Sequence, residues 1–374
     1  MLRRCAMVLS VASLVFSGVD FVTAATLYTV TDLGTLGGGY FSGYSEATGI
    51  NANGQVVGWD YSSGNQRAFL YSNGTMTDLG TLSGCSYAGA NGINANGQIV
   101  GTATVNSGTP HAFLYSGGAM SSLGTLPGDS GSYAYGINTN GQVVGTAYAA
   151  PTDSNYSHAF LYSNGTMQDL GTLVSGNAFS SDAYGINANG QVVGGAAASS
   201  GYHAFLYSSG KMTDLGTLPG YPGSCANGIN ANGQIVGNCV PKSGYESEAF
   251  LYSSGKMTDL GTLPGGDWSY ASGINDSGQV VGWSNRGAGL NYAFLYSNGT
   301  MQDLNGLIAP SSGWLLERAT AINNAGQIVG YGENAAGKTR AFLLTPTPEP
   351  SALVLLGMGF VAIAGYAWRR RRTM

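Results

Sequence analysis

Residues 49–58 read Gly-Ile-Asn-Ala-Asn-Gly-Gln-Val-Val-Gly, and close copies of this stretch recur along the chain and decide the fold. The Asn that opens its turn recurs every 43 to 49 residues, at Asn51, Asn94, Asn138, Asn187, Asn230, Asn275 and Asn323. An Ala-Phe-Leu element accompanies each copy, beginning at Ala68, Ala112, Ala159, Ala204, Ala249, Ala293 and Ala341. A third element, Asp-Leu-Gly-Thr-Leu, begins at Asp32, Asp78, Asp169, Asp214 and Asp259, with variants at Ser122 and Asp303. A period of this length with several short strands per unit is typical of propeller blades.

Each unit reads as four strands, A to D. Strand A ends in Gly-Ile-Asn, strand B is Gln-Val-Val-Gly or Gln-Ile-Val-Gly, strand C is Ala-Phe-Leu-Tyr, and strand D resembles Met-Thr-Asp-Leu. The Asn-Ala-Asn-Gly between A and B suits a type I turn followed by a left-handed Gly. Ser-Asn-Gly-Thr and its relatives between C and D predict a tight hairpin.

The strand count predicts how a ring would close. A first D-type strand, Tyr28–Leu36, precedes the first strand A, whereas the last unit, Ala319–Leu344, has A, B and C only. Pairing the first strand with Ala341–Leu344 would complete the last blade and remove an exposed edge. The sequence therefore predicts an all-β fold, a seven-bladed β-propeller of four-stranded blades over 26–344 closed by the N-terminal strand. An open solenoid is the alternative architecture.

Composition narrows the class of protein. Charged residues make up only 9% of the 374 residues, against 61 Gly and 23 Tyr, so small polar residues must cover the surface. Between residues 25 and 350 there are eight Lys or Arg against 18 Asp or Glu. This acidic balance argues against nucleic acid as a partner, and the composition indicates an extracellular protein.

Residues 1–25 are interpreted as a secretory signal peptide. Arg3 and Arg4 form the basic start, an apolar run follows from Cys5 to Val19, and small residues near Ala24 suit cleavage.

The C-terminus carries a second targeting signal. A Pro-rich linker, 345–350, ends in Pro348, Glu349 and Pro350, and 351–374 holds an uncharged apolar run followed by four arginines. The run just suffices to cross a bilayer as a helix, with its basic end in the cytoplasm. The order of these parts resembles the PEP-CTERM sorting signal. The resemblance implies processing by exosortase in a Gram-negative bacterium, with the membrane as a partner through this helix before processing. A plain C-terminal anchor is the alternative.

The repeats have a resemblance of their own. Ala-Phe-Leu-Tyr, preceded three times by His, together with Ile-Asn-x-x-Gly-Gln-Val-Val-Gly, is similar to HAF-repeat extracellular proteins over residues 28 to 344. The resemblance implies secretion and a repeat fold, and it brings no catalytic residues.

No constellation for catalysis or metal binding is expected. His111, His158 and His203 occupy equivalent positions in different units, where other units carry Arg or Glu, so they are interpreted as structural. The repeated Asp of strand D is expected to bond backbone at a strand turn, because catalysis needs one asymmetric cluster. We expect no metal, no cofactor and no enzymatic activity.

A disulfide between Cys225 and Cys239 is predicted from their spacing. If Asn230 pairs with Gln234 across the turn, the two cysteines face each other, within disulfide reach in an oxidising compartment. Two unlinked thiols are the alternative, and Cys85 has no assigned partner.

The functional hypothesis is a non-enzymatic cell-surface or extracellular-matrix protein, with a glycan-binding propeller for exopolysaccharide as the alternative. Aromatic residues in segments that vary between units support the second reading, whereas Tyr that merely fills gaps between blades would weaken it. The candidate ligand-binding aromatics are Trp59, Tyr61, Trp268, Trp283 and Trp314. The B–C and D–A loops should share one variable face, and the chain should leave from the opposite face of tight turns, so we expect the variable face to point away from the cell.

Overall fold

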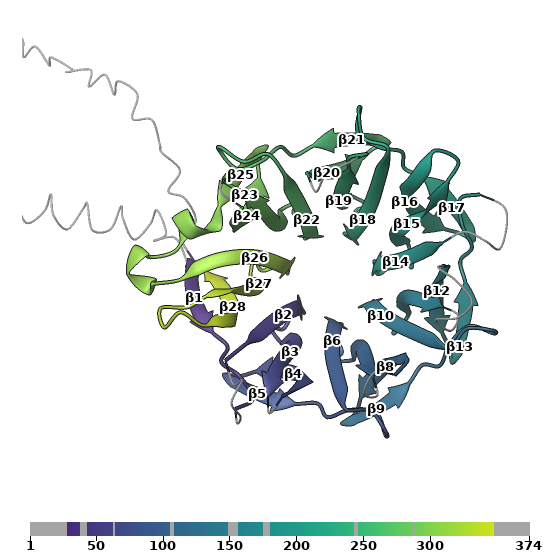
Figure 1. Ribbon diagram of the computed structural model, residues 1–374, viewed down its shortest axis with the longest axis horizontal. Coiled ribbons are helices and arrows are strands. Elements are labelled where there is room, and N and C mark those ends of the chain that lie inside the picture. Colours follow the sequence, from purple (N-terminus) through teal and green to yellow (C-terminus); the bar gives the residue numbers. More distant parts are fainter. Residues whose placement is uncertain are drawn as a thin grey trace, which may run out of the picture.

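The computed structural model describes residues 28–37, 43–62, 64–104, 108–148, 156–174, 180–242, 246–287 and 289–347. They form seven four-stranded antiparallel sheets arranged as blades around a central axis (Figure 1). The prediction of a seven-bladed propeller is confirmed. The predicted signal peptide, the Pro348-Glu349-Pro350 motif and the predicted membrane span lie outside the described residues. Within the described part of the chain, no helix has the length and apolar character needed to cross a membrane.

Each blade runs from an innermost strand A to an outermost strand D (Figure 1). Blades one to three are β2 (Ser45–Ile50), β3 (Val56–Ser62), β4 (Asn65–Ser72), β5 (Thr75–Asp78); β6 (Tyr87–Ile93), β7 (Ile99–Thr104), β8 (Pro110–Ser116), β9 (Ala119–Ser122); and β10 (Gly131–Ile137), β11 (Val143–Tyr148), β12 (Ser157–Ser163), β13 (Thr166–Asp169). Blades four to six are β14 (Ser181–Ile186), β15 (Val192–Ala198), β16 (Gly201–Ser208), β17 (Lys211–Asp214); β18 (Gly223–Ile229), β19 (Ile235–Val240), β20 (Glu248–Ser253), β21 (Lys256–Asp259); and β22 (Ser269–Ile274), β23 (Val280–Asn285), β24 (Asn291–Ser297), β25 (Thr300–Asp303). Two short 3-10 helices, η1 (Leu304–Leu307) and η2 (Pro310–Ser312), precede blade seven, which contains β26 (Leu315–Ile322), β27 (Ile328–Glu333), β28 (Thr339–Pro346) and β1 (Tyr28–Asp32).

The hydrophobic core lies between blades rather than inside any one of them. Phe69 of β4, for example, is fully buried in a cluster with Val329 and Ala341 of blade seven. Each blade supplies the same buried Phe from its third strand, at Phe69, Phe113, Phe160, Phe205, Phe250, Phe294 and Phe342. A blade therefore buries its apolar faces only when both neighbours are present, which explains why Val-Val and Phe-Leu runs are continuous rather than alternating.

The N-terminal strand closes the ring as predicted. β1 pairs antiparallel with β28, with Val30 opposite Leu344, and the amide of Leu33 donates to the carbonyl of Ala341 over 3.0 Å. The first strand of the chain is thus the outermost strand of the last blade, and β28 is not left as an exposed edge.

A closed ring of seven asparagines also joins the blades, at the A–B turns. The side-chain Nδ2 of each donates to the main-chain carbonyl of the next, and Asn323 donates to Asn51 over 3.0 Å to complete the circle. The members are Asn51, Asn94, Asn138, Asn187, Asn230, Asn275 and Asn323, and all are buried. We call this set the asparagine ring. The turns have the predicted geometry, since Gly54 takes φ +75° and donates to the Asn51 carbonyl.

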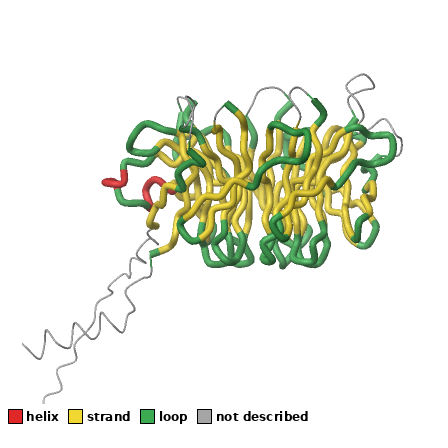
Figure 2. The backbone as a smooth tube through the Cα atoms, turned by 90° about the horizontal axis from the view of Figure 1, so that it is seen from below, coloured by secondary structure: helices red, strands yellow, loops and turns green. Residues whose placement is uncertain are grey.

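The short turns occupy one face of the disc, which Figure 2 shows as an even row. β28 ends on this face, because its last residue, Pro346, lies beside the Asn323–Gly326 turn: a Cβ on Gly326 would be 3.4 Å from Pro346 Cγ. β1 begins opposite the same residue. Both ends of the described chain therefore leave from the tight-turn face, as expected from the strand count.

Candidate functional site

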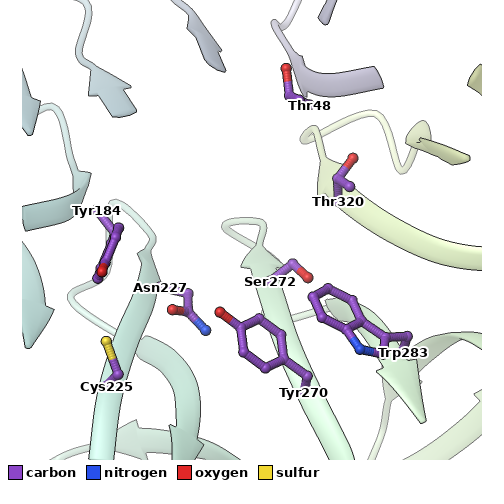
Figure 3. Close-up of a pocket in the computed structure, with 8 residues that line it drawn as sticks. All are labelled: Thr48, Tyr184, Cys225, Asn227, Tyr270, Ser272, Trp283 and Thr320. Carbon is purple, nitrogen blue, oxygen red and sulfur yellow. The ribbon is translucent and has the colours of Figure 1, made fainter. Parts of the chain in front are cut away.

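A chamber opens at the centre of the ring, between the innermost strands. Its volume is 380 Å³, and Figure 3 shows its lining residues converging on an open centre. They come from five of the seven blades: Thr48, Tyr184, Cys225, Asn227, Tyr270, Ser272, Trp283 and Thr320.

A β-bulge in every strand A sets one residue apart, and five of these seven residues line the chamber. In β2, Ala47 pairs with Gly58 and Gly49 pairs with Val57, so Thr48 between them has no cross-strand partner. Such a bulge re-aims the extra residue. The equivalent residues, which we call the bulge ring, are Thr48, Asn91, Tyr135, Tyr184, Asn227, Ser272 and Thr320.

The residue two positions earlier faces the same side, one step nearer the variable face, because strand A runs toward the tight turns. We call this set the mouth ring: Glu46, Gly89, Tyr133, Asp182, Cys225, Tyr270 and Arg318. The seven units are similar elsewhere, but at the mouth-ring position two of them carry a carboxylate, one carries a basic residue and two carry a large aromatic residue. The chamber is therefore asymmetric although the scaffold is not.

Four members of the bulge ring link neighbouring blades and three do not. Thr48 donates to the carbonyl of Ala90 over 2.7 Å, and Asn91, Asn227 and Thr320 make the same link to the next blade. The exceptions are Tyr135, Tyr184 and Ser272, and the Ser272 hydroxyl is buried with no hydrogen-bond partner in the described structure. Of these three, Tyr184 and Ser272 line the chamber.

Tyrosines and one carboxylate lie together on the inner strands of blades three and four, beside Tyr184 of the chamber lining. Asp182 accepts hydrogen bonds from the hydroxyls of Tyr202 and Thr146, the latter over 2.9 Å. The rings of Tyr135 and Tyr184 lie 5.2 Å apart, centroid to centroid. Burial raises the pKa of both phenols well above the usual value, so they remain neutral hydrogen-bond donors.

A stack of three side chains forms the wall at blades six and seven. Tyr270 stacks on Trp283 with centroids 4.2 Å apart, and the Arg318 Cζ lies 4.6 Å from the Trp283 ring centroid. Because Tyr270 covers one face of the indole, Arg318 must cover the other. Burial raises the pKa of Tyr270 to about 12.

Glu46 lies on the blade-one side of the mouth. It accepts a hydrogen bond from the Tyr44 hydroxyl, and Tyr44 stacks on Trp59 at 5.3 Å. Burial raises the pKa of the Glu46 carboxyl, although Tyr44 and the positive charge of Arg318 partly oppose the shift.

The five predicted ligand-binding aromatics have different positions. Trp283 lines the chamber and Trp59 lies opposite Glu46 of the mouth ring, but both stand on strands, β23 and β3, rather than in variable loops. Tyr61 is 39% exposed at the end of β3. Trp268 lies in the loop before β22, and Trp314 packs edge-on against Phe342 in the core beside blade seven. Trp314 therefore serves the core.

The disulfide prediction is wrong in this structure. Asn230 does pair with Gln234, but the bulge at Asn227 adds one residue to β18, so Cys225 lies opposite Asn238 and Cys239 lies opposite Ser224. A shift of one residue places the cysteines on opposite faces of the blade. Cys225 faces the chamber, Cys239 is buried in the core, and both are free thiols, as is Cys85.

Other candidates have structural roles. The strand D aspartates bond the backbone at the strand end, as predicted: Asp32 accepts from the amide of Gly34 over 2.8 Å, and Asp78, Asp169, Asp214 and Asp259 do the same. His203 pairs with Asp214 at 2.9 Å. The residues that the structure describes contain no cluster of His, Cys, Asp or Glu that could hold a metal ion.

One sequence feature could have predicted the residues that face the chamber. The Gly that ends Gln-Val-Val-Gly is required by the bulge, because a Cβ on Gly58 would lie 2.0 Å from the Glu46 carbonyl. A repeated Gly inside a strand often marks a bulge. The two positions of strand A that vary most among the units would then have appeared as the bulge and mouth rings.

Solved structures resemble this chain in fold. The β-propeller domain of the Trilobed protease from Pyrococcus furiosus, described as having an open velcro topology, aligns with a TM-score of 0.51 at 8% identity, covering 80% of this chain and 93% of that one. TolB from Acinetobacter baumannii gives 0.45 at 12% identity, covering 83% of this chain and 66% of TolB. An Aleuria aurantia lectin variant in complex with α-methyl-L-fucoside gives 0.38 at 13% identity, covering 87% and 99%. At these identities the likeness concerns the fold alone.

Comparison with curated proteins finds no match. The HAF-repeat resemblance thus stays a prediction. At the C-terminus, residues 346–372 match the PEP-CTERM protein-sorting motif. The chain therefore carries a signal that implies sorting by exosortase to the surface or exterior of a Gram-negative bacterium.

Proposed function

We propose that this protein is a non-enzymatic recognition protein of the bacterial surface or extracellular matrix, which binds a saccharide in its central chamber. The sorting motif supports the location, since it implies export. The chamber supports the ligand class, and the asymmetry of its two rings is the observation that carries the proposal.

Sugar rings present apolar faces edged with hydroxyls, and the chamber offers partners for both. Tyr184 and Tyr270 approach it from different blades, with the amide of Asn227 between them (Figure 3). The unpartnered hydroxyl of Ser272 and the hydroxyl of Thr48 add hydrogen-bonding atoms. Aromatic faces beside a few fixed polar groups suit such a ligand, and 380 Å³ is within the roughly 300–1,000 Å³ of small-molecule sites.

Binding without turnover is proposed because the carboxylates are occupied by fixed partners. Both oxygens of Asp182 accept hydrogen bonds from Tyr202 and Thr146, and Glu46 accepts one from Tyr44. Glycoside hydrolysis requires a pair of carboxyl groups flanking one bond, whereas these two project from blades one and four.

The orientation of the disc fits recognition of material outside the cell. The chain leaves β28 on the tight-turn face, so an anchor or sorting helix beyond it would hold that face toward the membrane. The chamber mouth then faces away from the cell. Exosortase and, before processing, the membrane would be partners of the C-terminal segment.

Binding to a broad glycan array tests the proposal. We expect the purified protein to bind a subset of saccharides, and Tyr184→Ala to weaken that binding about 10-fold through loss of ring contact. Tyr61→Ala is the matched control, because this exposed Tyr lies outside the chamber and its loss should leave binding unchanged. Absence of binding across the array, or equal loss in both variants, would refute a saccharide site in the chamber.

A further inference from the structure

Arg318 is the single basic residue among the fourteen positions of the mouth and bulge rings. It stands on the innermost strand of blade seven, two residues before Thr320 of the chamber lining. The position of this positive charge, at the entrance of a chamber in an acidic protein, suggests a role in binding an anion.

Arg318 places its guanidinium carbon near two aromatic rings, and its N–H groups have no hydrogen-bond partner among the described residues. The Cζ lies 4.6 Å from the ring centroid of Trp283 and 5.7 Å from that of Tyr331. In the described structure the guanidinium forms no ion pair and no hydrogen bond.

The other arginines of the described residues each use at least one N–H donor, and Arg340 donates to the Thr339 carbonyl over 3.5 Å. Arg67 pairs with Asp78 and Arg286 with Asp303, in each case binding a carboxylate of strand D. Arg318 has no such partner. A guanidinium that is fixed by aromatic faces and keeps its planar donors free is preorganised to bind an anion in bidentate geometry.

Resting on the proposed saccharide site, we propose that the chamber selects acidic saccharides and that Arg318 binds the carboxylate of a uronic acid unit at the mouth. One guanidinium neutralises one negative charge. Glu46 from blade one and Glu317 from the same strand are close enough for their charges to act on Arg318, and they would repel a more highly charged group such as a phosphate monoester.

The rest of the sugar would enter below the carboxylate. The Tyr270–Trp283–Arg318 stack places the charge next to the aromatic wall, and Ser272 and Asn227 lie one step deeper. The chain therefore offers a site for the charge, the ring and the hydroxyls in that order from mouth to floor.

The test compares oligomers of glucuronate or galacturonate with the corresponding neutral glucose or galactose oligomers and with sulfated and phosphorylated ones, using the full-length protein in calorimetric titrations. We expect the uronates to bind at least about 10-fold more tightly than the neutral oligomers, and to bind more weakly as ionic strength rises.

Three variants assign that preference to one side chain. Arg318→Met should abolish the preference for uronates, Arg318→Lys should retain part of it, and Glu46→Gln should strengthen uronate binding without changing that of neutral oligomers. Lys256→Met is the matched control, since it removes one positive charge from the outermost strand β21 and should change nothing.

The outcomes separate the two proposals. Neutral oligomers that bind as tightly as uronates, or an unchanged preference in Arg318→Met, would overturn the role of Arg318 while leaving a saccharide site in place. Sulfated or phosphorylated oligomers that bind more tightly than uronates would overturn the selection of carboxylates. No binding by any oligomer would overturn both proposals.

Discussion

The asparagine ring makes a sharp prediction about stability, for which Asn187 is the test position. Its Nδ2 donates to Gln191 Oε1 over 2.8 Å and to the Asn230 carbonyl over 3.0 Å. Its Oδ1 accepts from the amides of Asn189 and Gln191, both over 3.1 Å. Both hydrogen-bonding atoms of this buried side chain are thus used twice, in three bonds within its own turn and one bond to the next blade.

Asn187→Ala removes four hydrogen bonds at once. At roughly 0.5–1.5 kcal/mol net for each, the free energy of unfolding should fall by about 2–6 kcal/mol. Asn189→Ala is the control, because this exposed side chain makes one bond, Nδ2 to the Ala231 carbonyl over 3.4 Å, and its loss should cost less than about 0.5 kcal/mol.

Asn187→Asp separates the two halves of the interaction. The carboxylate keeps both acceptor bonds but loses both donor bonds, and it is buried against the carbonyl of Asn230. Its pKa in the folded protein should therefore rise above the value of about 3.9 in the unfolded chain. The variant should be most stable below that unfolded value and should lose stability as pH rises through the folded pKa.

Urea unfolding followed by fluorescence at several pH values measures all three variants against the parent. Equal, small losses of stability in Asn187→Ala and Asn189→Ala would show that the asparagine ring does not hold the blades together.

Three further predictions concern closure, thiols and pH. Deleting Tyr28–Asp32 should expose the edge of β28 and cause aggregation or loss of cooperative unfolding, and a deletion variant as soluble and stable as the parent would contradict closure by β1. Alkylation after denaturation, read by mass spectrometry, should find free thiols at Cys85, Cys225 and Cys239. In the native protein Cys225 should be labelled slowly, because burial raises its pKa to about 12. A Cys225–Cys239 disulfide would contradict the observed register. Burial, followed by the charge of Asp259, raises the pKa of Glu248 from 4.5 to about 6. The stability that protonated Glu248 contributes should therefore be lost as pH rises from 4.5 to about 6. Glu248→Gln should flatten this part of the plot of stability against pH, and an unchanged plot would refute the raised pKa of Glu248.

The sequence was sufficient to predict the fold because the same turn and strand patterns recur in seven units. Turn chemistry located the strand ends, the continuous apolar runs indicated blades buried on both sides, and the missing fourth strand predicted closure by Tyr28–Leu36. The first two inferences depend on local residue preferences, which a single unit already displays, and the third depends on counting strands from the first unit to the last.

The site was not predictable in the same way because a bulge is a difference of one residue between partner strands. The turn at Asn230 fixes the register only as far as Gly228, and the extra residue Asn227 then reverses which side every earlier residue faces. This reversal separated Cys225 from Cys239 and moved Cys225 into the chamber. For the same reason the sequence did not predict that Tyr184, Tyr270 and Arg318 lie near the central axis. That inference requires knowing that each strand A points two variable positions inward.

A structure of the protein with its tightest-binding saccharide tests the central claim most directly. The claim predicts the sugar in the central chamber, in contact with Tyr184 and Tyr270, within hydrogen-bonding distance of Asn227 or Ser272, and with any carboxylate on Arg318. A saccharide bound between the outer strands of neighbouring blades or on the tight-turn face, with the chamber empty, would contradict it.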